Sequence, residues 1–432
     1  MLAPHMFSTG RSTLVYAILS KLKGDSKLKR LFRGQRETLS KEQIASLENN
    51  RGAVWIHAAS VGEFEQARPL IERLQATGYG LQGSKQIPIV VTFFSPSGYE
   101  ARKNYDLADG VYYLPFATRR KAKKFLDALQ PKMAIFVKYE FWPAYLRALK
   151  KRGIPTYSIS AIFRPTQRFF HWYGHSSLKL LKCFTHIYVQ DEASRRLLAE
   201  HGIHDSSVAG DTRFDRVKQV QMDEGRCTKD LTPIAQFVEG YERVIIAGST
   251  WPEDEVLLTK YIDDWSSVIG DLNTKLILVP HELNEEHLHK IFCLFQGRFV
   301  RYSAVSAMSD AVSRRNILQR AQVLVIDTMG LLSSIYRFGQ VAYIGGGFGE
   351  GIHNTIEAAV YGVPVVFGPN YHHFREAQRL IDAGAARSIK NYNELEAALT
   401  TALEQHEEIG AKAAAYVQSE LGATDRIYKD LF

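Results

Sequence analysis

The stretch "AVWIHAASVGEFEQARPLIERL", residues 53–74, joins a predicted strand to a predicted helix through a short turn. Its first part is an apolar run rich in the residues that strands prefer. Apolar residues then recur at helical spacing from Phe64 onward, which predicts a helix beginning near Val61. Ser60 and Glu63 have the spacing of a capping box, a common helix start. The stretch is therefore typical of one strand–helix unit in a parallel α/β sheet.

The same alternation of short apolar runs and amphipathic segments continues along the chain. Five more runs follow in the first half and five in the second, at 87–94, 111–116, 133–138, 156–163 and 186–190, then 243–249, 275–281, 323–328, 341–347 and 364–369. Such runs between helices indicate parallel strands covered on both faces. The polar segment 216–242 has no strong strand and is predicted to connect two doubly wound α/β domains, 51–215 and 243–405. A final helix is expected over 406–432. With two such domains face to face, the cleft between them is the expected binding site.

Length and composition agree with two folded domains. The chain has 432 residues, too many for one ordinary core. Hydrophobic residues make up 45% and charged residues 23%, which argues against a disordered chain. The three cysteines are far apart and lack metal-ligand spacing, which fits a reducing compartment.

The charge predicts an anionic partner. The net charge is +8 and the pI is near 9.1. A basic cluster at 21–36 follows a short apolar stretch, 14–22, that is too short to span a bilayer. Segment 1–50 either lies at an anionic membrane surface or contains an ordinary amphipathic helix with a solvated basic side. A second stretch, 163–175, mixes basic and aromatic residues, and fits a nucleic-acid site, a lipid head-group site or a packed amphipathic helix.

Two glutamates follow predicted strands of the first domain. Glu63 either caps its helix or accepts a proton from a substrate. Glu140, in "VKYEFWPAYLRAL", is either structural, beside the helix start at Trp142 and Pro143, or a second carboxylate in the cleft. An inverting glycosyl transfer needs one base for the acceptor hydroxyl and hydrogen-bond donors for the leaving phosphate. Carboxylates in one domain and anion-binding turns in the other suit that reaction.

Three turns of the second domain have the composition of anion-binding loops. "IGGGFGEGIHNTIEAA", 344–359, combines glycines with a helix expected to start near His353. "AGSTWPEDE", 247–255, fits either a phosphate contact or plain helix capping by Ser249 or Thr250. "IDTMGLLSSIY", 326–336, turns through a glycine in the same way. The dinucleotide fingerprint and the Walker pattern are absent, which argues against a Rossmann dehydrogenase or a P-loop enzyme. The turns together predict a ligand that carries a phosphate.

Seven segments, in their order and spacing, resemble the Kdo transferase family, which adds 3-deoxy-D-manno-octulosonic acid (Kdo) to the lipid A precursor. They are "WIHAASVGE", "YEFWP", "GDTRFD", "GSTWPEDE", "IDTMG", "GIHNTIEAA" and "FGPNYHHFREA", and the likeness covers about 53–388. The resemblance implies a GT-B architecture with two Rossmann-like domains, and CMP-Kdo as donor. It also implies work at the cytoplasmic face of the inner membrane, with 406–432 returning to the first domain.

The same resemblance implies roles for individual residues. Glu63 is expected to be the general base on the acceptor hydroxyl, with Glu140 in support. Acceptor contacts are expected from Ser60, Gly62, Arg164 and Arg168. Donor contacts are expected from Ser249, Thr250, His281, Met329, Gly330, Gly347, His353, Asn354 and Glu357. Neither a cofactor nor a metal is expected.

The sequence departs from the family pattern at three places. Leu331 replaces a glutamate, His281 lacks the arginine expected before it, and Ile162 replaces an arginine, which leaves Arg164 as a substitute. Two other functions stay open. One is another GT-B enzyme, such as a UDP-sugar transferase or a nucleotide-sugar 2-epimerase. The other is a nucleic-acid-binding protein, which no sequence motif supports, so no nucleic-acid partner is expected.

Overall fold

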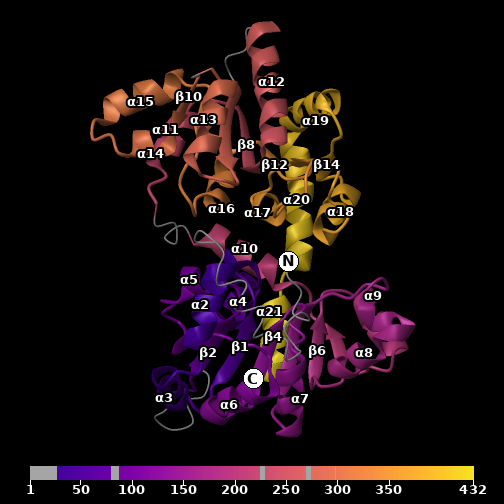
Figure 1. The fold of residues 1–432 in the computed structure, drawn as a ribbon. Coiled ribbons are helices and arrows are strands. Elements are labelled where there is room, and N and C mark those ends of the chain that lie inside the picture. Colours follow the sequence, from indigo (N-terminus) through magenta and orange to yellow (C-terminus); the bar gives the residue numbers. More distant parts are fainter. Residues whose placement is uncertain (1–26, 79–86, 224–228, 269–273, 297) are drawn as a thin grey trace. The chain divides into compact units, whose positions relative to one another are not determined.

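The computed structural model describes residues 27–78, 87–223, 229–268, 274–296 and 298–432. It divides the chain into two compact units (Figure 1). Unit 1 comprises Met1–Arg216 with Leu421–Phe432, and unit 2 comprises Val217–Glu420. Each unit contains a seven-stranded sheet in which all paired strands are parallel. The predicted class, two parallel α/β domains, is confirmed.

The sheet of unit 1 has the strand order β3-β2-β1-β4-β5-β6-β7. Its strands are β1 (Val54–Ala58), β2 (Ile89–Phe93), β3 (Gly110–Tyr113), β4 (Met133–Val137), β5 (Thr156–Ala161), β6 (His186–Val189) and β7 (Ser206–Val208). Every residue of β1, β2 and β4 is buried. Their apolar runs are continuous because helices cover both faces of the sheet.

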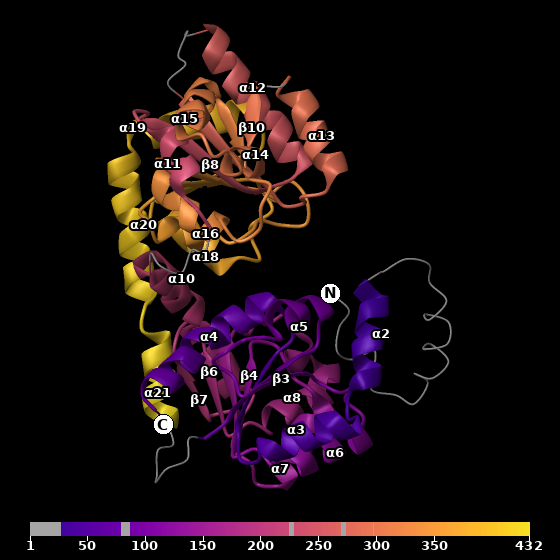
Figure 2. The ribbon, with the colours of Figure 1, turned by 90° about the vertical axis from the view of Figure 1, so that its left-hand side faces the viewer.

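The helices of unit 1 form two cores, one on each face of the sheet. One core surrounds Trp55 and draws residues from α3 (Lys41–Asn49), α6 (Arg119–Leu129), α7 (Pro143–Lys151) and α8 (His175–Leu181). The other surrounds Ile56 and draws on α4 (Val61–Ala76) and the C-terminal α21 (Ala423–Leu431). In both ribbon views the yellow α21 lies among the indigo and purple elements of unit 1 (Figures 1 and 2). The remaining helices described in this unit are α2 (Lys27–Glu37), α5 (Pro96–Arg102) and α9 (Glu192–Glu200), and α10 (Thr212–Met222) continues into unit 2.

The sheet of unit 2 has the order β10-β11-β9-β8-β12-β13-β14. Its strands are β8 (Arg243–Thr250), β9 (Thr274–Pro280), β10 (Phe299–Arg301), β11 (Val323–Val325), β12 (Val341–Ile344), β13 (Val365–Phe367) and β14 (Ala386–Ser388). Its helices include α11 (Thr232–Val238), α12 (Pro252–Val268), α13 (Glu285–Leu294), α14 (Tyr302–Ser306), α15 (Ala311–Arg320), α16 (Leu332–Ile335), α17 (Ile356–Ala359), α18 (Arg375–Asp382), α19 (Tyr392–Glu404) and α20 (His406–Glu420). Its main core surrounds Tyr343 and Leu278.

Each apolar run named in the sequence overlaps a strand, six in unit 1 and five in unit 2. The three strands that the runs miss are β7, β10 and β14, each of three residues. All three lie at sheet edges, and most of their residues are partly exposed. An edge strand needs no continuous apolar run, so it leaves little signal in the sequence.

The N-terminal boundary lies earlier than predicted. Residues 27–49, expected within a membrane-associating segment, form α2 and α3 and pack on unit 1. Gln35 shows how closely α2 is bound. Its buried amide donates to the carbonyl of Leu114 (2.8 Å) and accepts from the N–H of Phe116 (3.0 Å). The apolar stretch 14–22 lies outside the described residues.

The C-terminal segment is two helices rather than the single helix predicted. α20 belongs to unit 2 and α21 to unit 1, with Gly422 between them at a φ of 93°. Glycine adopts this left-handed backbone without steric cost. Asp215 holds the start of α21, since its carboxylate accepts from the N–H of Gly422 and from the N–H and hydroxyl of Thr424, each at 2.7 Å.

Candidate functional site

Glu63 caps its helix. The capping box is complete: Ser60 Oγ accepts from the Glu63 N–H (3.4 Å), and Glu63 Oε2 accepts from the N–H groups of Ala59 (2.6 Å) and Ser60 (3.2 Å). The helix begins at Val61, as the spacing predicts. Burial and the nearby negative charge of Glu140 raise the pKa of Glu63 to about 8.

Capping does not exclude a chemical role for Glu63. Both backbone donors reach the same oxygen, Oε2. A carboxyl group whose pKa lies near the working pH can both accept and release a proton. The two interpretations left open for this side chain are therefore compatible.

Glu140 is buried in the turn between β4 and α7, with 6% of the residue exposed. Its Oε2 accepts from the indole N–H of Trp142 (2.5 Å) and lies 3.1 Å from His57 Nε2. α7 begins at Pro143, as the sequence predicts. The charge of Glu140 acts on the pKa of Glu63, so the structure brings the two predicted glutamates together.

The carboxyl ends of β4 and β5 carry backbone strain. Lys138 and Ser160 have φ values of 56° and 51°. Positive φ values are uncommon for residues other than glycine, and such strained positions cluster at functional sites. The positive charge of Lys138 lowers the pKa values of Glu63 and Asp211, so Lys138 lies near both. Asp211 in turn pairs with Arg213 (2.7 Å). Lys138, Asp211 and Arg213 were not among the predicted site residues, although the "GDTRFD" segment contains two of them.

The predicted acceptor residues occupy different environments. Ser60 is the helix cap, and Gly62 is exposed with open space where a Cβ would lie. Arg164 is partly buried, and its Nη1 lies 3.5 Å from the hydroxyl of Tyr139. Arg168 begins a short 3-10 turn, η2 (Arg168–Phe170).

One interpretation of segment 163–175, a packed amphipathic helix, is wrong. This segment forms two 3-10 turns, η2 and η3 (Trp172–Gly174), and α8 begins only at His175. Pro165 removes an N–H that a helix would need. A Cβ at Gly174 would lie 1.7 Å from the carbonyl oxygen of Arg168, so the backbone can approach Arg168 this closely only with glycine at position 174. Trp172 is left 92% exposed.

The glycines of the 344–359 loop serve packing between turns. A Cβ at Gly345 would lie 2.3 Å from the carbonyl oxygen of Ser249, and one at Gly347 would lie 2.6 Å from the backbone of Gly368. The helix expected near His353 begins later, at Ile356, and has four residues. The predicted anion site at that helix start is therefore weaker than the sequence suggested.

Asp254 links two turns of unit 2, the 247–255 turn and the 344–359 loop. Its carboxylate accepts from the hydroxyl of Tyr343 (2.6 Å) and from the N–H groups of Gly346 and Trp251 (2.9 Å each). Burial raises its pKa. Because Asp254 reaches back to Trp251, it caps α12, in place of the Ser249 or Thr250 cap that the sequence left open.

The pairing of β8 with β9 is irregular between Gly248 and Thr250, and Ser249 lies at that irregularity. Ser249 has a φ of 56°, another strained position at a strand end. Thr250 is fully buried, and its hydroxyl donates to Glu255 Oε1 (3.0 Å). Thr250 thus stabilises the turn through a buried hydrogen bond. Burial raises the pKa of Glu255, which also lies 2.9 Å from His287 Nε2.

Three aromatic rings stack beside the Asp254 turn. The rings of Trp251 and His281 lie 4.8 Å apart at 21°, and those of His281 and His353 lie 4.5 Å apart at 29°. The Trp251 indole N–H donates to His353 Nε2 (3.2 Å). Burial and His281 lower the pKa of His353 to about 4. His353 is therefore neutral at pH 7, with its proton on Nδ1.

The other predicted donor residues lie on turns of the same unit. Met329 is 76% exposed, and Gly330 has a φ of 89°. Asn354 donates to Glu357 Oε1 (2.8 Å). Leu331, which stands where the family has a glutamate, is fully buried. A core contact has thus taken the place of that polar group.

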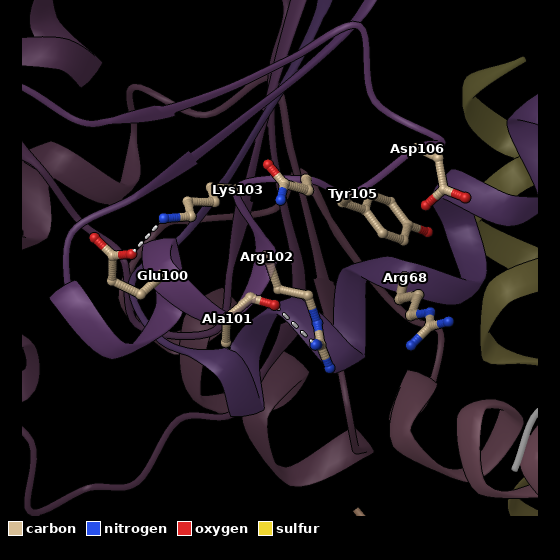
Figure 3. Close-up of a pocket in the computed structure, with 8 residues that line it drawn as sticks. Arg68, Glu100, Ala101, Arg102, Lys103, Tyr105 and Asp106 are labelled. Atoms are coloured by element: carbon tan, nitrogen blue, oxygen red, sulfur yellow. Dashed lines mark hydrogen bonds and ion pairs between the residues drawn. The ribbon is translucent and has the colours of Figure 1, made fainter. Parts of the chain in front are cut away.

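A cavity of about 260 Å³ lies beside α4 and α5 in unit 1 (Figure 3). It is lined by Arg68, Glu100, Ala101, Arg102, Lys103, Asn104, Tyr105 and Asp106. Its cations are paired: Arg102 with Glu65 (2.8 Å), Arg68 with Glu72 (2.9 Å) and Lys103 with Glu100 (2.9 Å). No predicted site residue lines it, so the candidate site lies elsewhere, at the carboxyl ends of the strands. Within the described ranges, no group of three or more His, Cys, Asp or Glu side chains could hold a metal ion.

Comparison with known proteins agrees with the geometry. Residues 30–216 match the family model described as 3-deoxy-D-manno-octulosonic-acid transferase (kdotransferase). The chain is 26% identical over 373 residues to the 3-deoxy-D-manno-octulosonic acid transferase of Aquifex aeolicus, an alignment that covers 84% of this chain and 90% of that protein. The enzyme of that name from Bordetella pertussis is 25% identical over 394 residues, covering 86% of this chain and 85% of the relative.

A solved structure supports the fold class. UDP-GlcNAc 2-epimerase from Neisseria meningitidis superposes with a TM-score of 0.60 at 16% identity, and covers 88% of this chain and 98% of that one. At this identity the likeness concerns the fold alone, and it is the GT-B fold. Residues 30–216 therefore carry the Kdo transferase domain, and the chain is a glycosyltransferase related to the Kdo transferases.

Proposed function

We propose that the enzyme transfers Kdo from CMP-Kdo to the lipid A precursor lipid IVA, with Glu63 as general base. The observation that carries this proposal is the environment of Glu63. Its carboxyl group sits at a strand end beside Glu140, and its pKa is about 8. A base with such a pKa is strong enough to take a proton from a sugar hydroxyl and is partly ionised near neutral pH.

In the proposed reaction, Glu63 of unit 1 acts on the acceptor and residues of unit 2 bind the donor. Glu63 accepts the proton of the acceptor hydroxyl while the hydroxyl oxygen bonds to the anomeric carbon of Kdo. The bond from that carbon to the phosphate oxygen breaks, and its electron pair leaves with CMP. In unit 2, the neutral imidazole of His353, which the Asp254 turn helps to position, supplies its Nδ1–H as a hydrogen-bond donor for the anionic groups of CMP-Kdo. Five other predicted donor residues, Ser249, Met329, Gly330, Asn354 and Glu357, are proposed to complete that site, with Thr250, His281 and Gly347 supporting its turns.

The direct test is transfer of labelled sugar from CMP-Kdo, generated in situ, to a tetra-acylated lipid A precursor in detergent. We expect product from the wild-type chain without added metal. UDP-sugars tested in parallel address the alternative GT-B functions. Product from a UDP-sugar and none from CMP-Kdo would contradict the proposal.

We also propose that the enzyme works at the anionic cytoplasmic face of the inner membrane. From Phe141 to Gln190 the sequence has eight Lys or Arg residues and no Asp or Glu. Trp172 and Tyr173 project from this basic region, 92% and 54% exposed. Aromatic side chains beside cations favour the head-group layer of an anionic membrane. In the described part of the chain, no helix is both long and apolar enough to cross a membrane.

Replacing both Trp172 and Tyr173 by Ala is expected to weaken binding to anionic vesicles about tenfold, because burial of aromatic surface in the interface is lost. Cosedimentation with phosphatidylglycerol vesicles measures the effect. Phe292→Ala, which removes a half-exposed aromatic ring from unit 2, is the control and should bind as the wild type does. Equal binding by the double variant and the wild type would exclude these two side chains from the membrane contact.

A further inference from the structure

His57 is a buried titratable residue with no role so far. It lies near the end of β1, with no exposed surface, and its ring packs edge-on against Phe136 and Trp142. A fully buried imidazole needs a partner for each ring nitrogen. Here Nδ1 faces Thr92 on β2, and Nε2 faces Glu140.

Nδ1 faces two oxygens of Thr92. It lies 3.0 Å from the carbonyl oxygen of Thr92, which can only accept a hydrogen bond. The hydroxyl of Thr92, 2.9 Å from Nδ1, accepts from the indole N–H of Trp55 (2.9 Å) and keeps its own proton to donate. Thr92 therefore provides a partner for Nδ1 in either tautomer of the ring.

The other ring nitrogen lies against Glu140. Oε2 of Glu140 already accepts from the indole N–H of Trp142 (2.5 Å) and lies 3.1 Å from His57 Nε2. In the tautomer that has its proton on Nε2, the same oxygen accepts from two buried N–H donors. These two hydrogen bonds together hold Oε2 in one place.

We propose that His57 is a positioning residue for the transfer reaction: its Nε2–H donates to Oε2 of Glu140 and holds that carboxylate beside Glu63. This rests on the proposed role of Glu63. Without His57, Glu140 would keep the hydrogen bond from Trp142 and lose the one from Nε2, so its carboxylate would no longer be held in place. The negative charge that strengthens Glu63 as a base would then act from farther away.

Two amide variants separate this role from simple packing. The amide nitrogen of Gln reaches the place of Nε2, whereas that of Asn reaches only the place of Nδ1. We expect His57→Asn to lower kcat by about 10- to 100-fold with little change in the KM for the donor. We expect His57→Gln, which still donates to Glu140, to retain most of the wild-type kcat.

The pH profile is a second readout. In His57→Asn, the acidic limb of the kcat profile should move to lower pH by about one unit, because the charge of Glu140, no longer held in place, raises the pKa of Glu63 less. The other groups that act on Glu63 are unchanged in both variants: the charge of Lys138 and the N–H groups of Ala59 and Ser60. His57→Gln should keep the wild-type limb.

A third readout needs no substrate. The full chain labelled with 15N-tryptophan gives indole N–H signals from five tryptophans, and Trp142→Phe assigns that of Trp142. The Trp142 signal should stay in place in His57→Gln and move upfield in His57→Asn, because its hydrogen bond to Glu140 weakens when His57 no longer holds that carboxylate. His186→Gln is the control, since His186 bonds Ser207 (2.8 Å) on the other side of the sheet's centre.

The outcomes distinguish this inference from the function on which it rests. A folded His57→Asn enzyme with wild-type kcat and pH profile would overturn it. So would equal losses in the Asn and Gln variants with an unmoved Trp142 signal, which would indicate packing alone. If the wild-type chain transfers no Kdo, the proposed function fails, while the Trp142 signal still decides whether His57 holds Glu140 in place.

Discussion

Glu63→Gln should lower Kdo transfer at least 100-fold and leave CMP binding near the wild-type level. A positioned general base contributes about 10²- to 10⁴-fold, and glutamine cannot take up the acceptor's proton. CMP binding should persist because the proposed donor residues belong to unit 2. The transfer assay measures the first quantity and calorimetric titration with CMP the second.

The chain offers a matched control for the capping role. Glu394 occupies the third position of α19, as Glu63 does in α4. Its Oε2 accepts from the N–H of Lys390 (2.9 Å), and its own N–H donates to the Asn391 cap (3.0 Å). Glu394→Gln should therefore reproduce the small structural cost of weakening a capping box, with full transfer activity. A loss of less than about tenfold in Glu63→Gln would contradict the catalytic assignment.

The pKa of Glu63 sets the expected pH dependence. Because burial and Glu140 raise this pKa to about 8, the carboxyl group holds a proton below that pH and is a free base above it. The transfer rate should rise with pH toward a plateau, with an acidic limb near 8. A rate that is flat from pH 5 to 9 would indicate that another group accepts the proton.

How far the sequence could predict the site depends on how local each feature is. The strand–turn–helix unit of Glu63 is encoded within a few residues, so its helix start at Val61 and its capping box were both predictable. Three of the four edge strands, β7, β10 and β14, were not, since exposed three-residue strands carry no distinctive pattern. The return of α21 to unit 1 was implied by the family resemblance, whereas its break at Gly422 was not.

The contacts that tune the site join residues far apart in the chain. His57 meets Glu140 across 83 positions, and Trp251 meets His353 across 102. Nothing in either segment alone indicates its partner, and the pKa values follow from burial that only the folded core creates. The glycines of the 344–359 loop illustrate the same limit. Their spacing suggested close approach to a ligand, yet the structure shows that Gly345 and Gly347 are needed for packing against neighbouring turns.

Asp254→Ala should have the largest structural effect in unit 2 and should abolish CMP binding. It would leave the hydroxyl of Tyr343 and the N–H groups of Gly346 and Trp251 without their acceptor in a site where Asp254 is 1% exposed. Each buried donor that loses its partner costs about 1–3 kcal/mol, so the expected loss of unfolding free energy is roughly 3–5 kcal/mol. Scanning calorimetry measures that loss, and titration with CMP measures binding.

Two further variants make the Asp254 test specific. Asp254→Asn keeps one oxygen for the backbone N–H groups and an amide for Tyr343, so it should recover part of the stability and part of the CMP affinity. Glu253→Ala removes an exposed carboxylate from the same helical turn, and should change the unfolding free energy by no more than about 0.5 kcal/mol. If Asp254→Ala binds CMP as tightly as Glu253→Ala does, the Asp254 turn and the stacked rings beside it are not the donor site. The turns that carry Met329 and Asn354 would then be the candidates for the donor site.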